Sequence, residues 1–129
     1  MMTKPKLKIK PGFIDYLFEM ISLIVLFSIV IITIINYSDL SETIPTHFNL
    51  FGIADSYGSK VNLWLFPFIA VIAYAGFTIL VRFPHAYNYP VQITEYNAEK
   101  SYKIGIRVMR VLKVLFLVLL LYIILKKVL

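Results

Sequence analysis

Three long apolar runs constrain the fold of this chain more than any other feature. They cover residues 16–36, 63–81 and about 106–125. A helix of about 20 apolar residues crosses the roughly 30 Å of hydrocarbon in a bilayer. We therefore predict an all-α integral membrane protein, built as a single membrane domain over residues 1–129 with three transmembrane helices.

The composition leads to the same conclusion. Of the 129 residues, 60% are hydrophobic and 16% are charged. A chain this short cannot hide so much apolar surface from water, so the lipid bilayer or a protein partner must cover it. The chain contains no cysteine, which excludes disulfides, thiolate metal ligands and thiol nucleophiles.

The third run is too short to cross the bilayer alone, because only residues 114–125 are free of charge. Its helix must therefore begin in the preceding segment. At 100° per residue, the preceding basic residues share one helix face. They are Lys100, Lys103, Arg107, Arg110 and Lys113. We expect a basic amphipathic extension of the third helix, with the last four of these residues contacting lipid headgroups or a partner protein. A re-entrant third segment is the alternative, since the charge-free part is short.

The 13 Lys and Arg residues divide unequally between the two sides of the predicted membrane. Ten lie on the side of the N-terminus, and Lys60, Lys126 and Lys127 lie on the other. The positive-inside rule places the N-terminus and the segment 82–105 in the cytoplasm and the loop 37–62 outside the cell membrane. The last two lysines argue against this orientation, and a re-entrant segment would return them inside. Because most of the basic residues flank apolar runs, we assign them to lipid headgroups and expect no nucleic-acid partner.

The outer loop carries more structural signals than a solvated linker. Pro45 favours extended geometry at the residue before it, and Gly52 and Gly58 can adopt the positive φ of a tight turn. Asn49 and Asp55 are side chains that hydrogen-bond turns. The apolar residues of the loop include Ile44, Phe48, Leu50, Phe51 and Ile53. We expect the loop to fold against the helix ends.

The cytoplasmic segment 82–105 is expected to begin extended, because of Pro84 and Pro90. Residues 91–94 then alternate between apolar and polar as in a short strand. Thr94 is the expected N-cap of the third helix, with acidic residues in the first turns, where the helix dipole favours them.

Two sequence patterns resemble a known family. Residues 44–49 read Ile-Pro-Thr-His-Phe-Asn and are followed by Gly52, Asp55 and Lys60. This pattern resembles the signature of a bacterial membrane domain of unknown function that forms the N-terminal part of SdpI-type immunity proteins, named for the sporulation-delay toxin. The second pattern, within residues 83–97, resembles the cytoplasmic segment of small family members. Its candidate site residues are Asn88, Tyr89, Pro90, Thr94, Glu95 and Asn97. The resemblance implies protection against a membrane-active toxic peptide, with toxin-dependent signalling to a repressor in the best-known member.

The outer loop allows two interpretations. In one, His47, Asn49 and Asp55 hydrogen-bond the loop backbone at the membrane surface. In the other, aromatic residues of the loop receive the apolar part of an external peptide, while Asp55 and Glu42 attract its cationic part. The candidate residues for either role are Pro45, His47, Phe48, Asn49, Gly52, Asp55 and Lys60. We expect no metal site, because the loop lacks a two-histidine spacing.

Asp15 and Glu19 lie one helical turn apart at the start of the first run. They either pair with the basic face of Arg107, Arg110 and Lys113 or stabilise the helix N-terminus together with water. The sequence does not decide between the two.

Two functions remain open at this point. One is an immunity or sensor protein for a membrane-active peptide. The other is a structural or accessory subunit that packs with a transporter, a signalling protein or copies of itself. We expect that the protein is not an enzyme and binds no cofactor. The sequence shows no nucleophile with a base, no carboxylate pair and no phosphate-binding loop at a spacing suited to catalysis. We also expect no proton or ion path, since we interpret the second run as free of polar interruptions.

Overall fold

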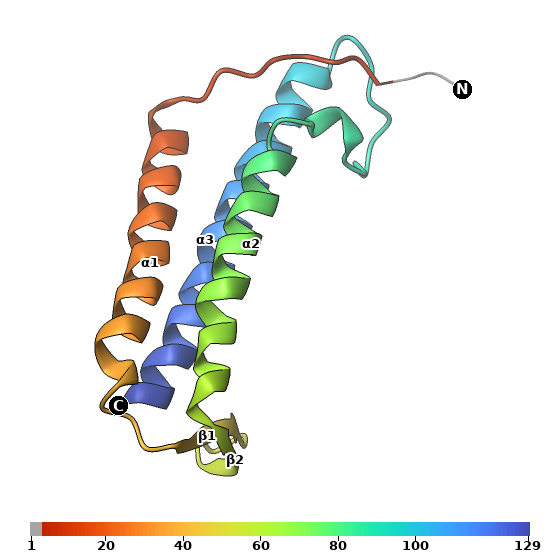
Figure 1. Cartoon of the computed structure of the whole chain (residues 1–129). Coiled ribbons are helices and arrows are strands. Elements are labelled where there is room, and N and C mark those ends of the chain that lie inside the picture. Colours follow the sequence, from red (N-terminus) through yellow and green to blue (C-terminus); the bar gives the residue numbers. More distant parts are fainter. Residues whose placement is uncertain (1–3) are drawn as a thin grey trace.

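The computed structural model describes residues 4–129 as three long helices and a small hairpin. The elements are α1 (Phe13–Tyr37), β1 (Thr43–Phe48), β2 (Ala54–Ser59), the 3-10 helix η1 (Lys60–Trp64), α2 (Leu65–Leu80), the 3-10 helix η2 (Pro84–Ala86) and α3 (Ala98–Val128). The long helices lie side by side, with the hairpin across one end and the N-terminal segment across the other (Figure 1). We call these the hairpin end and the N-terminal end.

All three long helices meet the requirements for crossing a membrane. The candidate spans are Phe13–Tyr37, Lys60–Leu80, which joins η1 to α2, and Ala98–Val128. Between 17% and 22% of the most apolar window in each span is buried inside the structure. The remaining apolar surface therefore faces outward, as expected for a multi-pass protein whose solvent is lipid.

The loop between α1 and α2 departs from the all-α prediction, because it forms a two-stranded antiparallel hairpin. β-branched residues such as Thr43 and Ile44 favour strand geometry, and Pro45 is tolerated since each strand of a two-stranded sheet has a free edge. Ile44 is buried and joins the core between the helices. That contact fixes the hairpin to the bundle.

The core of the bundle lies towards the hairpin end. It contains Ile29, Ile44, Leu63, Ala70, Leu117, Leu120 and Ile124. The last three follow helical spacing along one face of α3. Two buried hydroxyls on α1 bond carbonyl oxygens of their own helix, Ser22 to Glu19 and Thr33 to Ile29, both at 2.8 Å. Buried polar groups that are paired in this way do not interrupt the packing.

The third helix is continuous from Ala98 to Val128. Its 31 residues extend about 46 Å at 1.5 Å per residue, which exceeds the hydrocarbon thickness of a bilayer. Its last lysines, Lys126 and Lys127, contact the hairpin. The C-terminus therefore lies at the hairpin end, and the re-entrant alternative is wrong, because the apolar run continues a helix that began well before it.

Four local expectations also need correction. The segment 82–105 does not begin extended, since Pro84–Ala86 form the 3-10 helix η2. Residues 91–94 form no strand, since no neighbouring strand pairs with them in the described part of the chain. Asn97 occupies the N-cap position of α3, while Thr94 closes the preceding turn by accepting from the amides of Tyr96 and Asn97 at 3.3 Å. Of the two loop glycines, Gly52 has a positive φ of 76° and Gly58 does not.

Candidate functional site

The tip of the hairpin is a tight turn organised by Asn49. The side-chain oxygen of Asn49 accepts from the amides of Phe51 at 2.9 Å and Ile53 at 3.1 Å. Gly52 donates its amide to the carbonyl of Asn49 at 2.9 Å and takes up the positive φ that the turn requires. Asn49 and Gly52 thus structure the tip, in agreement with the first interpretation of the loop.

His47 and Asp55 face each other across the two strands. Their Nδ1 and Oδ1 atoms are 2.6 Å apart, and both side chains are well exposed. An exposed ion pair contributes only about 0–1 kcal/mol to stability. Asp55 therefore does not serve as the turn-bonding residue that its position suggested, and the pair remains accessible to a ligand.

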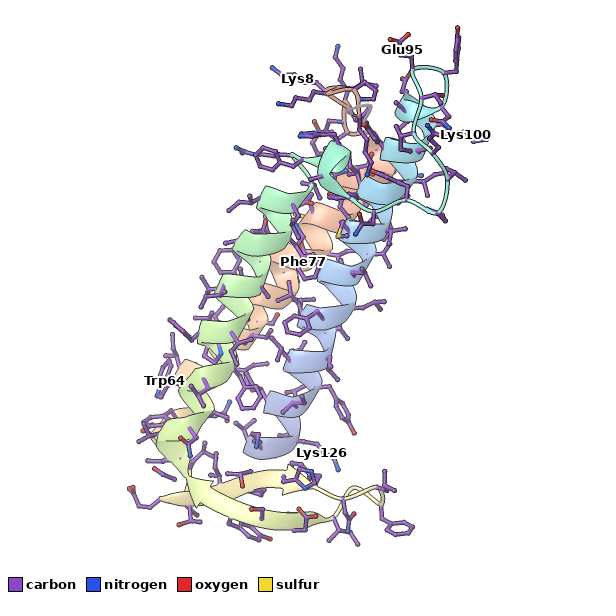
Figure 2. The ribbon with its side chains drawn as sticks, turned by 90° about the vertical axis from the view of Figure 1, so that its right-hand side faces the viewer. Lys8, Trp64, Phe77, Glu95, Lys100 and Lys126 are labelled. Atoms are coloured by element: carbon purple, nitrogen blue, oxygen red, sulfur yellow. The ribbon has the colours of Figure 1, made fainter. Side chains whose placement is uncertain are left out.

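Three lysines hold the hairpin against the helix ends. Lys127 donates to the carbonyl of Pro45 at 2.8 Å, and Lys126 donates to that of Gly52 at 2.9 Å. Lys60 lies 3.3 Å from two carbonyl oxygens at the end of α1 and just beyond it. We call Lys60, Lys126 and Lys127 the lysine clamp. Figure 2 shows Lys126 at the end of α3, beside the hairpin.

A groove of about 450 Å³ lies between the hairpin and the ends of α2 and α3. Its lining residues are Thr46, His47, Phe48, Asn49, Leu50, Gly52, Phe66, Tyr122, Ile123, Lys126 and Lys127. Beside it, the tip residues Leu50, Phe51 and Ile53 are exposed, Leu50 completely so. The hairpin end thus combines an aromatic groove, two ammonium groups and an apolar tip. We call this combination the hairpin surface.

A second polar cluster joins α1 to α3 nearer the N-terminal end. Glu19 accepts from Lys113 at 2.6 Å and from Nε of Arg110 at 3.1 Å. Asp15 lies 3.4 Å from Arg110 and 3.5 Å from Arg107. We call these five residues the ionic layer. The ion pairs that were one of the two expectations for Asp15 and Glu19 are therefore present. Asp15 also caps α1, because its carboxylate accepts a hydrogen bond from the amide of Gly12 at 2.7 Å.

The ionic layer is more enclosed than the sequence indicated. Lys113 is completely buried, and the side chain of Arg110 is only 12% exposed. The prediction that these two cations contact headgroups is therefore wrong. The ammonium of Lys113 lies 3.4 Å from the hydroxyl of Thr78 and 4.4 Å from the centre of the Tyr74 ring, both on α2. The interpretation of the second run as free of polar interruptions is therefore wrong. Tyr74 and Thr78 are four residues apart and so lie on one helix face, and this spacing in the sequence could have predicted a polar contact there. Lys103 remains on the surface and pairs with Glu99 at 3.2 Å.

Residues of the second family pattern hold the N-terminal end together. The ring of Tyr89 packs 5.7 Å from that of Tyr102, and its hydroxyl donates to the carbonyl of Pro84 at 2.7 Å. Burial raises the pKa of Tyr89 to about 12, which keeps this donor protonated. The side chain of Asn97 bonds the backbone of Thr94 at 2.8 Å and of Gln92 at 2.9 Å. The other pattern residues, Asn88, Pro90 and Glu95, are exposed.

The N-terminal segment is tied over this cluster. Tyr102 donates its hydroxyl to the carbonyl of Pro5 at 2.6 Å, and Lys4 donates to the carbonyl of Tyr87. Ile9 packs against the buried residues Ile93 and Tyr102. Within residues 4–129, no group of three or more His, Asp or Glu side chains is arranged to hold a metal ion.

A family match covers the part of the chain that contains the hairpin. Residues 23–71 match the model of a family described as a domain of unknown function, DUF1648. An uncharacterized protein of Archaeoglobus fulgidus is 35% identical over 65 residues, which cover 44% of this chain and 36% of the relative. No solved structure matches the chain. The region from α1 through the hairpin to the first turns of α2 is therefore similar to the DUF1648 domain of unknown function.

Proposed function

We propose that this chain is a small immunity or sensor protein that recognises a membrane-active toxic peptide through its hairpin surface. The observation that carries the proposal is the exposed apolar tip, held beside an aromatic groove by the lysine clamp. A free loop would lose conformational entropy on binding, whereas a clamped hairpin is already ordered. The resemblance of residues 44–60 to SdpI-type immunity proteins supports the same role.

The proposed orientation places the hairpin surface outside the cytoplasmic membrane. Ten of the 13 Lys and Arg residues belong to segments at the N-terminal end, and the three at the hairpin end form the clamp. The positive-inside rule then favours a cytoplasmic N-terminus. The two C-terminal lysines, which counted against this orientation, have a structural role at the hairpin end. An external peptide would reach the hairpin without crossing the bilayer.

The chemistry of the hairpin surface fits an amphipathic peptide. Leu50 and Phe51 are exposed at the tip and offer contact for apolar side chains of a peptide lying in the membrane interface. Glu42 is 90% exposed, and the carboxylate of Asp55 is accessible beside His47. These two acids would attract cationic side chains of the same peptide.

The proposal is tested by protection assays in a peptide-sensitive bacterial host. Cells expressing the chain are challenged with a panel of cationic amphipathic peptides, and the minimal inhibitory concentration is measured. We expect Phe51→Ser to abolish most of the protection, and His47→Ala with Asp55→Ala to reduce it, because a few central contacts carry most of the binding energy. The loss in peptide affinity should be about tenfold or more for Phe51→Ser.

Tyr96→Ser is the matched control, because Tyr96 is an equally exposed aromatic residue at the N-terminal end. It should leave protection unchanged. Wild-type protection by all hairpin variants at normal expression would contradict peptide recognition at this surface. The accessory-subunit alternative instead predicts no protection by the wild type and a membrane protein that co-purifies with the chain from its native membrane.

A further inference from the structure

A second cavity lies at the opposite end of the molecule from the hairpin surface. It has a volume of about 470 Å³, is open on one side and is lined by the N-terminal segment and all three long helices or their flanking turns. Its lining residues are Leu7, Lys8, Ile9, Glu19, Thr78, Val81, Arg82, Pro84, Ile106 and Arg110. Neither family pattern predicts this cavity, because its walls come from segments that are distant in sequence.

The cavity has an excess of positive charge. Three cationic side chains, Lys8, Arg82 and Arg110, line it together with one carboxylate, Glu19. That carboxylate is already bonded to Lys113 and to Nε of Arg110. Within residues 4–129, Lys8 and Arg82 form no salt bridge with any acidic group. The cavity therefore presents two cations without an anionic partner.

The remaining walls are suited to a ligand that is anionic at one end and apolar at the other. Thr78 contributes a hydroxyl, while Leu7, Ile9 and Ile106 contribute apolar surface. Arg82 lies two residues beyond the end of α2, where an apolar span is followed by the headgroup region. A guanidinium binds phosphate oxygens through paired N–H donors, and an ammonium adds a point charge.

We propose that this cavity binds the phosphoryl group of an anionic phospholipid headgroup, with Lys8 and Arg82 as its main ligands and Arg110 at its inner wall. The bound lipid would contact α2, α3 and the N-terminal segment together and so stabilise the end of the bundle that the hairpin does not reach. Free phosphate offers the same oxygen chemistry, and the experiment separates the two sources. The proposal does not depend on the function of the hairpin surface.

The test uses the full-length protein, purified in a neutral detergent. Native mass spectrometry measures the affinity for phosphatidylglycerol and for phosphatidylcholine, and thermal unfolding without lipid measures stabilisation by inorganic phosphate. The site variant is Lys8→Gln with Arg82→Gln. The matched control, Lys6→Gln with Lys100→Gln, removes two exposed charges from the same end outside this cavity. Figure 2 shows Lys8 and Lys100 at this end of the molecule.

We expect the wild type to prefer phosphatidylglycerol, the site variant to lose about tenfold or more in affinity for it, and the control to change it by less than about threefold. Stabilisation by inorganic phosphate that the site variant abolishes would identify free phosphate as a ligand of the same site. Binding of phosphatidylglycerol without any stabilisation by inorganic phosphate would identify the lipid as the ligand. Equal losses in both double variants, or a wild type without preference for the anionic lipid, would overturn the proposal. The wild-type comparison holds even where a variant fails to fold.

Discussion

Replacing Glu19 with leucine is expected to lower the free energy of unfolding by about 3–5 kcal/mol, because it leaves a buried cation without its closest partner. Lys113 has no exposed surface, and its ammonium lies 2.6 Å from Oε2 of Glu19. The hydroxyl of Thr78, at 3.4 Å, cannot replace a carboxylate. Reversible unfolding in mixed micelles, followed by circular dichroism, measures the change.

Two further variants isolate the cause of this loss. Glu19→Leu combined with Lys113→Met replaces the buried pair by apolar side chains of similar size and should recover most of the lost stability. Glu99→Leu removes a carboxylate from an exposed pair, with Lys103 at 3.2 Å, and should cost less than about 1 kcal/mol. A double variant no more stable than Glu19→Leu would show that the ionic layer does not act through charge pairing.

Replacing Gly105 with alanine is expected to destabilise the N-terminal end by about 1–3 kcal/mol, although alanine is the better helix former. A Cβ at this position would lie 2.9 Å from the hydroxyl oxygen of Tyr89 and 3.1 Å from Cδ2 of Tyr87. These rings pack on α3 because glycine leaves space for them. The tyrosine cluster, and with it the attachment of the N-terminal segment, must shift to accommodate the methyl group.

Gly76 provides the matched control, because it is a helix-interior glycine whose added Cβ would meet nothing within 4 Å. Gly76→Ala should leave stability unchanged or raise it by up to about 1 kcal/mol. Hydrogen exchange locates the effect of Gly105→Ala, which should increase exchange in residues 84–105 and leave the hairpin protected. Equal effects of the two substitutions would contradict a role of Gly105 in packing the tyrosines.

The number of long helices could be predicted from the sequence, because it follows from the lipid that surrounds the chain. The length of the apolar runs and the energetic cost of charges in lipid require three spans, and the structure has three helices that meet that requirement. The pairing of Asp15 and Glu19 with α3 was one of two open expectations. It is present because the basic residues of α3 and the acids of α1 occur at the same depth of the bundle.

Features that depend on chain segments distant in sequence could not be predicted in this way. The sequence does not predict the hairpin, because Pro45 obscures the strand pattern and the pairing of His47 with Asp55 depends on a register with irregularities near His47. The positive-inside rule alone does not explain Lys126 and Lys127, because their carbonyl partners lie on the hairpin, which is distant in sequence. The cavity at the N-terminal end combines residues from four chain segments, none of which forms a motif alone.

In the proposed topology, the hairpin and the C-terminus share one face of the membrane, while the N-terminal end lies on the other. Because the chain has no cysteine, single cysteines can be introduced at Ser56, Glu95 and Leu129, which are all exposed. Their labelling by a membrane-impermeant maleimide is then measured in intact cells and after permeabilisation. We expect Ser56→Cys and Leu129→Cys to react in intact cells, and Glu95→Cys to react only after permeabilisation. Leu129→Cys behaving like Glu95→Cys, or Ser56→Cys and Glu95→Cys reacting from the same side, would contradict the arrangement of the three spans.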